Sequence, residues 1–255
     1  MGHTRRFDAV ICDIDGCLAP ESSASFDVAA LARIAAYNRR AQEHRDRPVV
    51  TLCSGRPEPF VEAMCRLIGN AALPCIAENG VWMYHPATNG YDMDPAIKPG
   101  HLVAVEEARE WVRRELGPMG VVMQPGKAAS ISLYHERTEV LKGLESRVRE
   151  EFAGRGWPLR ASMTWFYINC DLKHVSKGTA IDRWAKVTGI RRERLAGFGD
   201  TAGDLLIAER VGWFGCPANA VDEIKKRADH RSQRAEVEGV IEFLQALVGT
   251  ESAKR

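Results

Sequence analysis

Short apolar runs that end in glycine or polar residues recur along the chain and predict buried β-strands. Four of them lie at 9–12 (AVIC), 49–53 (VVTLC), 75–78 (CIAE) and 195–199 (LAGFG). None of the runs alternates apolar and polar residues, which is typical of strands that are covered on both faces of a parallel sheet. We therefore expect these segments to form the centre of a parallel sheet.

Amphipathic segments between these runs predict helices that cover the sheet. Their apolar residues recur at intervals of three and four, as on one face of a helix. The segments are 26–44, 56–69, 176–189, 202–212 and 236–249. The helix at 176–189 begins at a serine, a preferred N-cap, and ends at a glycine, a preferred C-terminal residue. The alternation of strands and helices predicts an α/β fold with right-handed crossovers.

The middle of the chain follows a different pattern. Between residues 84 and 171, two helical segments are interspersed with strands that alternate apolar and polar positions. The helical segments are 101–116 and 138–152, and the strands are 129–135 and 164–172. This mixture is typical of an α+β insertion. We therefore predict a core formed by residues 1–83 and 172–255, with an inserted α+β cap at 84–171.

Composition and charge narrow the class of protein. With 255 residues, 45% of them hydrophobic, the chain can bury a sizeable core. Its net charge of +1 provides no strong field for nucleic acid or a membrane surface. We expect no membrane-spanning helix and no signal peptide, because no long apolar stretch is present. The seven cysteines form no CxxC pair, so we expect buried thiols and a cytoplasmic setting.

Paired aspartates follow two of the predicted strands. If the first strand continues through Asp15, then Asp13 and Asp15 face one region, because residues two apart share a side. Asp200 and Asp204 share a side if a helix begins there. Converging carboxylates repel one another unless a cation or a proton compensates them. The pairs therefore predict a Mg²⁺ site, or a nucleophile beside an acid/base; a turn and a plain helix start are the alternatives.

Groups suited to an anion accompany the aspartates. Ser54, Gly55 and Arg56 lie between a predicted strand and a predicted helix, where backbone N–H groups and a hydroxyl bind anions. Lys177 lies in the first turn of a helix, where a cation opposes the helix dipole unless an anion is near. A simple helix cap and a solvated lysine are the alternatives. Taken together, these groups are the equipment for phosphoryl transfer.

These motifs resemble, in chain order, the four motifs of the haloacid dehalogenase (HAD) superfamily of phosphohydrolases. They are Asp13-Ile14-Asp15-Gly16, Ser54-Gly55-Arg56, Lys177-Gly178, and Gly199-Asp200 followed by Asp204. The sequences SGRP, ENG at 78–80 and PANAVDEIKKRAD are similar to the Cof-type branch (type IIB) with its C2 cap, near the sugar-phosphate phosphatases. The resemblance implies a Rossmann-like, HAD-like core and a cap that determines substrate specificity.

The resemblance also implies a catalytic role for each motif. Asp13 is expected to be the nucleophile that forms an aspartyl-phosphate, and Asp15 the acid/base for the leaving alcohol and for water. Ser54 would donate a hydrogen bond to the transferring phosphoryl group, and Lys177 would offset negative charge. These four residues are the predicted catalytic set.

The implied cofactor is Mg²⁺. Asp13, the backbone carbonyl of Asp15 and Asp200 would ligate it, and Asp204 would hold the metal or its water shell. The family often has asparagine before this last aspartate, where the present chain has Gly203. A contact near the metal is therefore missing, which lowers the expected metal affinity.

Further residues are expected to contact phosphate or substrate. They are Gly16, Gly55, Arg56 and Asn79 in the core and Lys127 in the cap. Other basic candidates in the cap, suited to a second anionic or hydroxyl-rich group, are His135, Arg137 and Arg160. Trp165 and Phe166 are expected to pack rather than to stack on a sugar.

The predicted function is Mg²⁺-dependent hydrolysis of a small, sugar-like phosphomonoester, so the expected partner is a small phosphorylated metabolite. A phosphomutase of the phosphomannomutase type would use the same aspartyl-phosphate and stays an alternative. A signalling protein that keeps its phosphate is a second alternative, because receiver domains combine the same groups. A receiver domain, however, is about half this length and has no large cap. Oligomeric state and natural substrate stay open.

Overall fold

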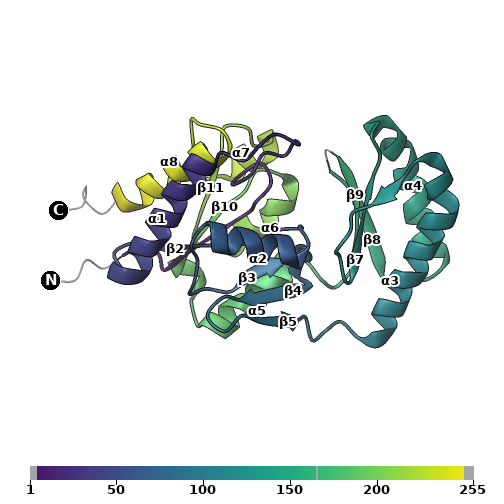
Figure 1. Cartoon of the computed structure of the whole chain (residues 1–255), viewed down its shortest axis with the longest axis horizontal. Helices are drawn as coiled ribbons and strands as arrows, with labels where there is room; N and C mark the ends of the chain where they lie inside the picture. Colours follow the sequence, from purple (N-terminus) through teal and green to yellow (C-terminus); the bar gives the residue numbers. More distant parts are fainter. Residues whose placement is uncertain (1–4, 165, 250–255) are drawn as a thin grey trace.

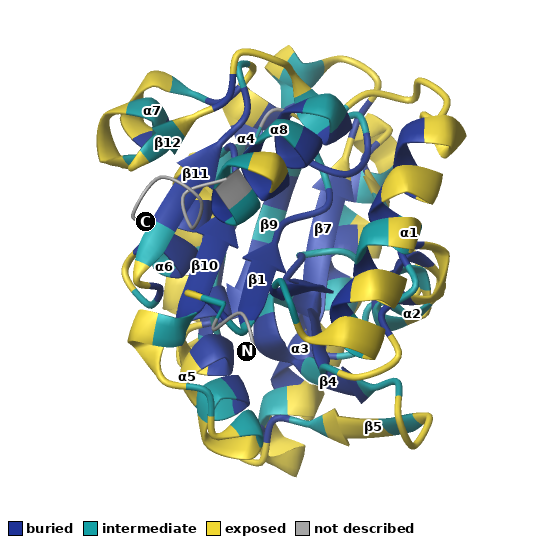
Figure 2. Cartoon of the chain, turned by 90° about the vertical axis from the view of Figure 1, so that its left-hand side faces the viewer, coloured by how far each residue is buried: buried dark blue, intermediate teal, exposed yellow. Residues whose placement is uncertain are grey.

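A parallel five-stranded sheet forms the core of the computed structural model, which describes residues 5–164 and 166–249. The strand order is β12-β11-β10-β1-β2, and each neighbouring pair is parallel. The strands are β1 (Ala9–Cys12), β2 (Val49–Leu52), β10 (Leu195–Phe198), β11 (Trp213–Cys216) and β12 (His230–Arg231). β1, β2 and β10 are buried throughout, as Figure 2 shows for the centre of the sheet. The predicted α/β core with a parallel sheet is confirmed.

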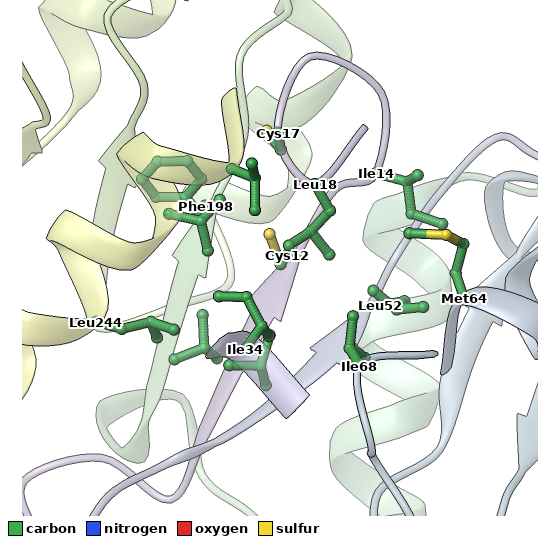
Figure 3. Packing of buried hydrophobic residues seen from close by; sticks show 14 of the residues in the cluster. Cys12, Ile14, Cys17, Leu18, Ile34, Leu52, Met64, Ile68, Phe198 and Leu244 are labelled. Atoms are coloured by element: carbon green, nitrogen blue, oxygen red, sulfur yellow. The ribbon is translucent and has the colours of Figure 1, made fainter. Parts of the chain in front are cut away.

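Helices cover both faces of this sheet. Those of the core are α1 (Val28–His44), α2 (Glu58–Leu67), α5 (Lys177–Thr188), α6 (Leu205–Ala208), α7 (Asp222–Arg227) and α8 (Glu236–Gly249). α1, α2 and α8 pack on the face that carries Cys12 and Phe198, where Ile34 of α1 and Leu244 of α8 meet them (Figure 3). α5, α6 and α7 pack on the opposite face, which carries Ile11. Burial on both sides explains why the strands lack alternation.

One predicted helix is wrong in length. The segment 202–212 forms a 3₁₀ turn (Ala202–Asp204) and then only the four residues of α6. The chain leaves the helix because the N–H of Gly212 donates to the carbonyl oxygen of Leu195, which leads the backbone directly into β11. The apolar spacing here reflects burial beneath the sheet and not a long helix.

A small antiparallel sheet beside the core contains the predicted run at 75–78, so the expectation that this run belongs to the parallel sheet is wrong: it pairs with the strand that follows it in the chain. The small sheet consists of β3 (Cys75–Ala77), β4 (Trp82–His85) and β5 (Gly90–Met93), in that order. Ile76 of β3 forms a parallel bridge with Cys53, just beyond β2, which attaches this sheet to the edge of the core. The predicted division between core and cap at residue 84 falls within β4 and stays a prediction. β4 pairs with β3 on one side and with β5 on the other.

The inserted α+β region has its own sheet and its own hydrophobic core. Its strands are β6 (Val122–Met123), β7 (Ser130–Tyr134), β8 (Leu159–Met163) and β9 (Tyr167–Leu172), antiparallel in the order β6-β7-β9-β8. Helices α3 (Pro99–Trp111, continued by a π-helical turn at Val112–Leu116) and α4 (Thr138–Gly154) pack on one face, against Ile131 and Ile168. Figure 1 shows this sheet between its two helices and the core.

Two further expectations concern membranes and cysteines. Within the described parts of the chain, no helix combines the length and the apolar character needed to cross a bilayer. All seven cysteines are buried and free, as predicted. The cytoplasmic setting stays a prediction.

Candidate active site

The two N-terminal aspartates lie on a tight turn that follows the central strand. β1 ends at Cys12, so the strand does not continue through Asp15. The backbone N–H of Asp13 still donates to the carbonyl oxygen of Phe198 at 3.0 Å. Beyond it, the carbonyl oxygen of Ile14 accepts three successive N–H groups and closes the turn. Both aspartates therefore remain at the carboxyl end of the sheet, where ligands bind in α/β folds.

Glycine is required at the next position of this turn. Gly16 has a φ of +70°, and a Cβ atom on it would lie 2.0 Å from Oδ2 of Asp200. Its carbonyl oxygen accepts a hydrogen bond from the side-chain amide of Asn219 at 2.9 Å. Gly16 thus lets the first turn pass directly against an aspartate of the fourth motif, while its predicted contact with phosphate stays a prediction.

Lys177 joins two of the buried aspartates. Its Nζ atom lies 3.0 Å from Oδ2 of Asp13 and 2.7 Å from Oδ1 of Asp204. The other oxygen of Asp13 accepts the N–H of Ile14 at 2.8 Å. Lys177 is the first residue of α5, and Ser176 caps that helix as predicted. The cation at this unfavourable end of the helix is thus stabilised by two buried carboxylates.

The fourth motif is held by its own backbone. Oδ2 of Asp204 accepts the N–H groups of Asp200 and Thr201, both at 3.0 Å. Because Lys177 occupies its other oxygen, Asp204 has a fixed orientation. Gly203 leaves space here, since a Cβ atom on it would meet only Oγ1 of Thr201, at 3.7 Å.

Three carboxylates form a group suited to a divalent cation. Asp13, Asp200 and Asp204 are buried, and each offers one oxygen within 4.8 Å of the others. Burial, followed by the charge of Asp204, raises the pKa of Asp13 to about 8 and that of Asp200 to about 9. Lys177 alone does not offset this negative charge. Carboxylate oxygens are the ligands that Mg²⁺ prefers, so the donor set fits the implied metal.

The carboxylate of Asp15 lies outside this group and pairs with Arg56. Nε of Arg56 donates to Oδ1 at 3.0 Å and to Oδ2 at 2.8 Å, while Nη2 donates to Oδ1 at 2.6 Å. The guanidinium also lies over the ring of Phe60, 5.1 Å from its centroid. The predicted substrate ligand Arg56 is therefore bound to the predicted acid/base in this structure.

The second motif lies between β2 and α2, as predicted. Ser54 is fully buried, and its Oγ accepts the N–H of Arg56 at 3.2 Å. A Cβ atom on Gly55 would lie 3.1 Å from the side-chain oxygen of Asn79, so these two predicted residues are in contact. The side-chain nitrogen of Asn79 in turn donates to the carboxylate of Asp171 in β9, at 3.2 and 3.4 Å.

Lys127 is the predicted cap residue that lies against the core. The preceding Gly126 would place a Cβ atom 3.4 Å from Pro57, next to Arg56. Nζ of Lys127 donates to Oγ of Ser132 at 2.5 Å. Within residues 5–164 and 166–249 it forms no ion pair, and burial lowers its pKa despite the nearby negative charges of Asp171 and Glu78.

The remaining cap candidates have other contacts. His135 is buried, with Nε2 3.1 Å from the carbonyl oxygen of Met119, while Arg137 is exposed. Arg160 donates to the carbonyl oxygens of the chain segment that returns to the core, at 2.7 to 3.1 Å. Phe166 is 38% exposed, so its packing role stays a prediction, and Trp165 lies outside the described residues.

Sequence reasoning missed two acidic residues at the site. Glu21 follows the turn after Asp15, and burial, followed by the charge of Asp15, raises its pKa to about 7. Glu78 belongs to the ENG motif, yet the motif itself does not indicate that its carboxylate is buried in contacts with the cap. Both positions depend on the path of a loop, which periodicity does not encode.

Comparisons with known proteins show similarity over most of the chain. Residues 123–244 match the family described as haloacid dehalogenase-like hydrolase. Among curated proteins, the phosphoglycolate phosphatase of Methanospirillum hungatei is 27% identical over 241 residues, which cover 92% of this chain and 94% of that protein. The similarity therefore extends over both the core and the insertion.

Solved structures share the fold. A protein of Thermoplasma acidophilum superposes with a TM-score of 0.73 at 19% identity, covering 94% of this chain and 98% of that one. The sucrose-phosphatase of Synechocystis, solved with sucrose and phosphate, superposes with a TM-score of 0.65 at 16% identity, covering 96% and 98%. At these identities the structural matches show a common fold.

Proposed function

We propose that the chain, which is similar to haloacid dehalogenase-like hydrolases and to curated phosphoglycolate phosphatases, is a phosphatase of that family and hydrolyses a small phosphomonoester through an aspartyl-phosphate on Asp13. The main support is the environment of Asp13 at the end of β1. One of its oxygens accepts the N–H of Ile14, and the other faces Lys177. This arrangement presents a carboxylate in a defined orientation beside a cation, as a nucleophile that attacks an anionic phosphoryl group requires.

In the first half-reaction, an oxygen of Asp13 attacks phosphorus and forms the acyl phosphate. The bond between phosphorus and the ester oxygen breaks, and the leaving oxygen takes a proton from Asp15. The positive charge of Lys177, 3.0 Å from Asp13, offsets the negative charge that accumulates on the phosphoryl group. Backbone N–H groups and the hydroxyl of Ser54 would orient the phosphoryl oxygens.

In the second half-reaction, Asp15 accepts a proton from water, and the resulting hydroxide attacks phosphorus. The bond between phosphorus and the Asp13 oxygen breaks, so inorganic phosphate leaves and the carboxylate of Asp13 is restored. One residue thus acts as acid and then as base, as the two directions of proton transfer require.

Arg56 has to change partner during this cycle. The oxygens of Asp15 accept three hydrogen bonds from Arg56, which occupies the positions that a leaving group or water would approach. A phosphoryl group is an equally good bidentate partner for a guanidinium. Arg56 would therefore move from Asp15 to the phosphoryl group when substrate binds, consistent with its predicted role.

Asp13, Asp200 and the backbone carbonyl of Asp15 would hold Mg²⁺, with Asp204 beside them. When bound, Mg²⁺ neutralises charge on the phosphoryl oxygens. The raised pKa values of Asp13 and Asp200 support a compensating cation at this place, because burial of several carboxylates is otherwise costly.

The cap favours a leaving group with a second anionic group, such as a carboxylate. Lys127 lies at the core-facing side of the cap without an ion pair among the described residues, so a substrate anion would complete its interactions. Curated relatives named phosphoglycolate phosphatase support the same class. A sugar-like phosphate, predicted from the sequence, is the second candidate, because Ser132 and Asn169 offer hydrogen bonds to hydroxyl groups.

A phosphatase screen tests this proposal. Phosphate release is measured from 2-phosphoglycolate, phosphoglycerates, sugar phosphates and p-nitrophenyl phosphate, with Mg²⁺ and with EDTA. We expect Asp13→Asn to lower the rate by at least about a thousandfold. The exposed Asp182→Asn, which removes an ion pair with Arg210 away from the site, is the matched control. Full activity in Asp13→Asn would contradict the proposed mechanism.

A further inference from the structure

The carboxylate of Glu78 connects the core to the cap. One of its oxygens accepts the N–H of Ala128 at 2.9 Å, and the other accepts the N–H of Ala129 and the hydroxyl of Ser130, both at 2.8 Å. The residue is only 1% exposed. A buried carboxylate is tolerated where donors satisfy it, and here the donors come from consecutive residues of the other structural unit.

The loop that carries Glu78 is held in an unfavourable backbone conformation. Glu78 and Asn79 have φ values of +52° and +54°, which side-chain-bearing L-residues rarely adopt. Conformations of this kind persist where the surrounding structure enforces them, and they cluster at functional sites. The ENG sequence therefore specifies a strained loop and not an ordinary turn.

The catalytic motifs enforce this conformation. The N–H groups of Glu78 and Asn79 donate to the carbonyl oxygens of Arg56 and Ser54, at 2.9 and 3.0 Å. A Cβ atom on Gly80 would lie 2.8 Å from the carbonyl oxygen of Ser176, which caps the helix of Lys177. The loop thus contacts both the second and the third motif, and these contacts hold the backbone from which the Glu78 side chain extends.

The cap segment that Glu78 binds is also held from its other side. Nη2 of Arg109, in α3, donates to the carbonyl oxygens of Lys127, Ala128 and Ser130, at 2.7 to 3.2 Å. The carboxylate of Glu78 thus accepts hydrogen bonds from N–H groups of this segment, and the guanidinium of Arg109 donates hydrogen bonds to its carbonyl oxygens. The segment begins with Lys127, so its position relative to the catalytic motifs depends on both contacts.

We propose that Glu78 is a positioning residue for substrate selection: it fixes residues 128–130 relative to the catalytic loops and thereby places Lys127 at the leaving-group side of the site. Glu78 itself touches no reacting atom. This inference rests on the proposed function of Lys127. A carboxylate is needed because it only accepts hydrogen bonds, whereas glutamine would direct an N–H group at another N–H group.

The test compares Glu78→Gln with a matched control. Asp94→Asn is that control. Asp94, on the connection that leads into α3, is also buried, also accepts a backbone N–H (from Ala96) and forms an ion pair with Arg183 of α5. For each variant, kcat and KM are measured with 2-phosphoglycolate and with p-nitrophenyl phosphate, whose leaving group has no carboxylate. Hydrogen exchange at residues 127–132 is measured in parallel.

We expect Glu78→Gln to reduce the selectivity, defined as the ratio of kcat/KM for 2-phosphoglycolate to that for p-nitrophenyl phosphate, by about tenfold, chiefly through KM. Amide exchange at Ala128 and Ala129 should accelerate. Asp94→Asn should leave the selectivity unchanged. Combining Glu78→Gln with Lys127→Ala should reduce the selectivity no further than Lys127→Ala alone, because both changes remove the same interaction.

Two results overturn the inference. One is equal loss for both substrates in Glu78→Gln, which indicates a purely structural role, and the other is unchanged exchange at residues 127–132. If Glu78→Gln does not fold, Glu78→Asp replaces it, because the shorter side chain cannot reach all three donors. If the unchanged protein prefers no carboxylated substrate, the proposed substrate class fails, and the exchange measurement still decides whether Glu78 fixes the segment.

Discussion

Two nitrogens of Arg56 donate hydrogen bonds to the carboxylate of Asp15, at 2.6 to 3.0 Å, although the two residues are 41 positions apart in the chain. The pair joins the first motif to the second and is more exposed than the three buried aspartates. In the proposed reaction, Asp15 transfers protons and Arg56 binds the phosphoryl group. The ion pair between them therefore belongs to the state of the protein before substrate binds. Substrate binding would then exchange one bidentate partner of Arg56 for another.

Removing Arg56 tests this exchange. Arg56→Ala should lower kcat/KM for every phosphomonoester by about ten- to a hundredfold, because the guanidinium contacts the phosphoryl group and not the leaving group. Steady-state kinetics on two chemically different substrates measure this effect. The control is Arg47→Ala, which removes a similar arginine–carboxylate pair with Asp46 outside the site. Loss of activity with only one of the substrates would contradict the assigned role.

Lys177 should support folding as well as catalysis. In Lys177→Ala, Asp13 and Asp204 lose their shared buried partner, so we expect the free energy of unfolding to fall by about 3 kcal/mol or more. Urea denaturation with EDTA present measures this change. The double variant Lys177→Ala/Asp204→Asn should recover part of the loss, since it also removes one uncompensated charge. No recovery would show that packing of the lysine stem, and not charge, is responsible.

The metal-free protein should lose stability as pH rises. The pKa of Asp200 is raised from 3.8 to about 9 by burial first and by Asp204 second, so the folded state binds more protons than the unfolded state between these values. The stabilisation is complete below pH about 4 and is lost as pH rises through about 9. We expect the Tm in EDTA to fall from pH 6 to pH 9, and Mg²⁺ to raise the Tm more at pH 9 than at pH 6. A Tm that is independent of both pH and Mg²⁺ would argue against a metal at this cluster.

Two glycines provide a matched pair of substitutions. Gly16→Ala introduces a Cβ atom 2.0 Å from Asp200 at a φ of +70°, so we expect a loss of more than about 2 kcal/mol in unfolding free energy and weaker Mg²⁺ binding. Gly143→Ala lies inside α4 with nothing within 4 Å, and should stabilise the protein by about 0.5–1 kcal/mol. Thermal unfolding with and without Mg²⁺ compares the two. Equal behaviour of the two variants would exclude a special role for the turn at Gly16.

Local patterns were sufficient for the elements that build the core. β1 coincides with the predicted run at 9–12, and α8 with the predicted helix at 236–249. α5 begins immediately after its predicted cap, Ser176. These segments succeed because apolar periodicity and capping residues act over a few neighbouring positions. β8 and β11 escaped prediction, because each is short and contains a residue that strands disfavour, Ala161 in β8 and Gly215 in β11.

The chemical groups of the site can be read from the amino-acid sequence alone. The aspartates at 13, 15, 200 and 204, Ser54 and Lys177 follow strand ends or begin helices, and parallel strands present their carboxyl ends at one edge. The pairing of these groups, in contrast, follows from the three-dimensional fold. Arg56 binds Asp15, Lys177 bridges two carboxylates, and Glu78 accepts backbone N–H groups of the cap. Such pairings depend on loop paths and on contacts between distant segments, which are set by packing of the whole chain and not by the residues nearby.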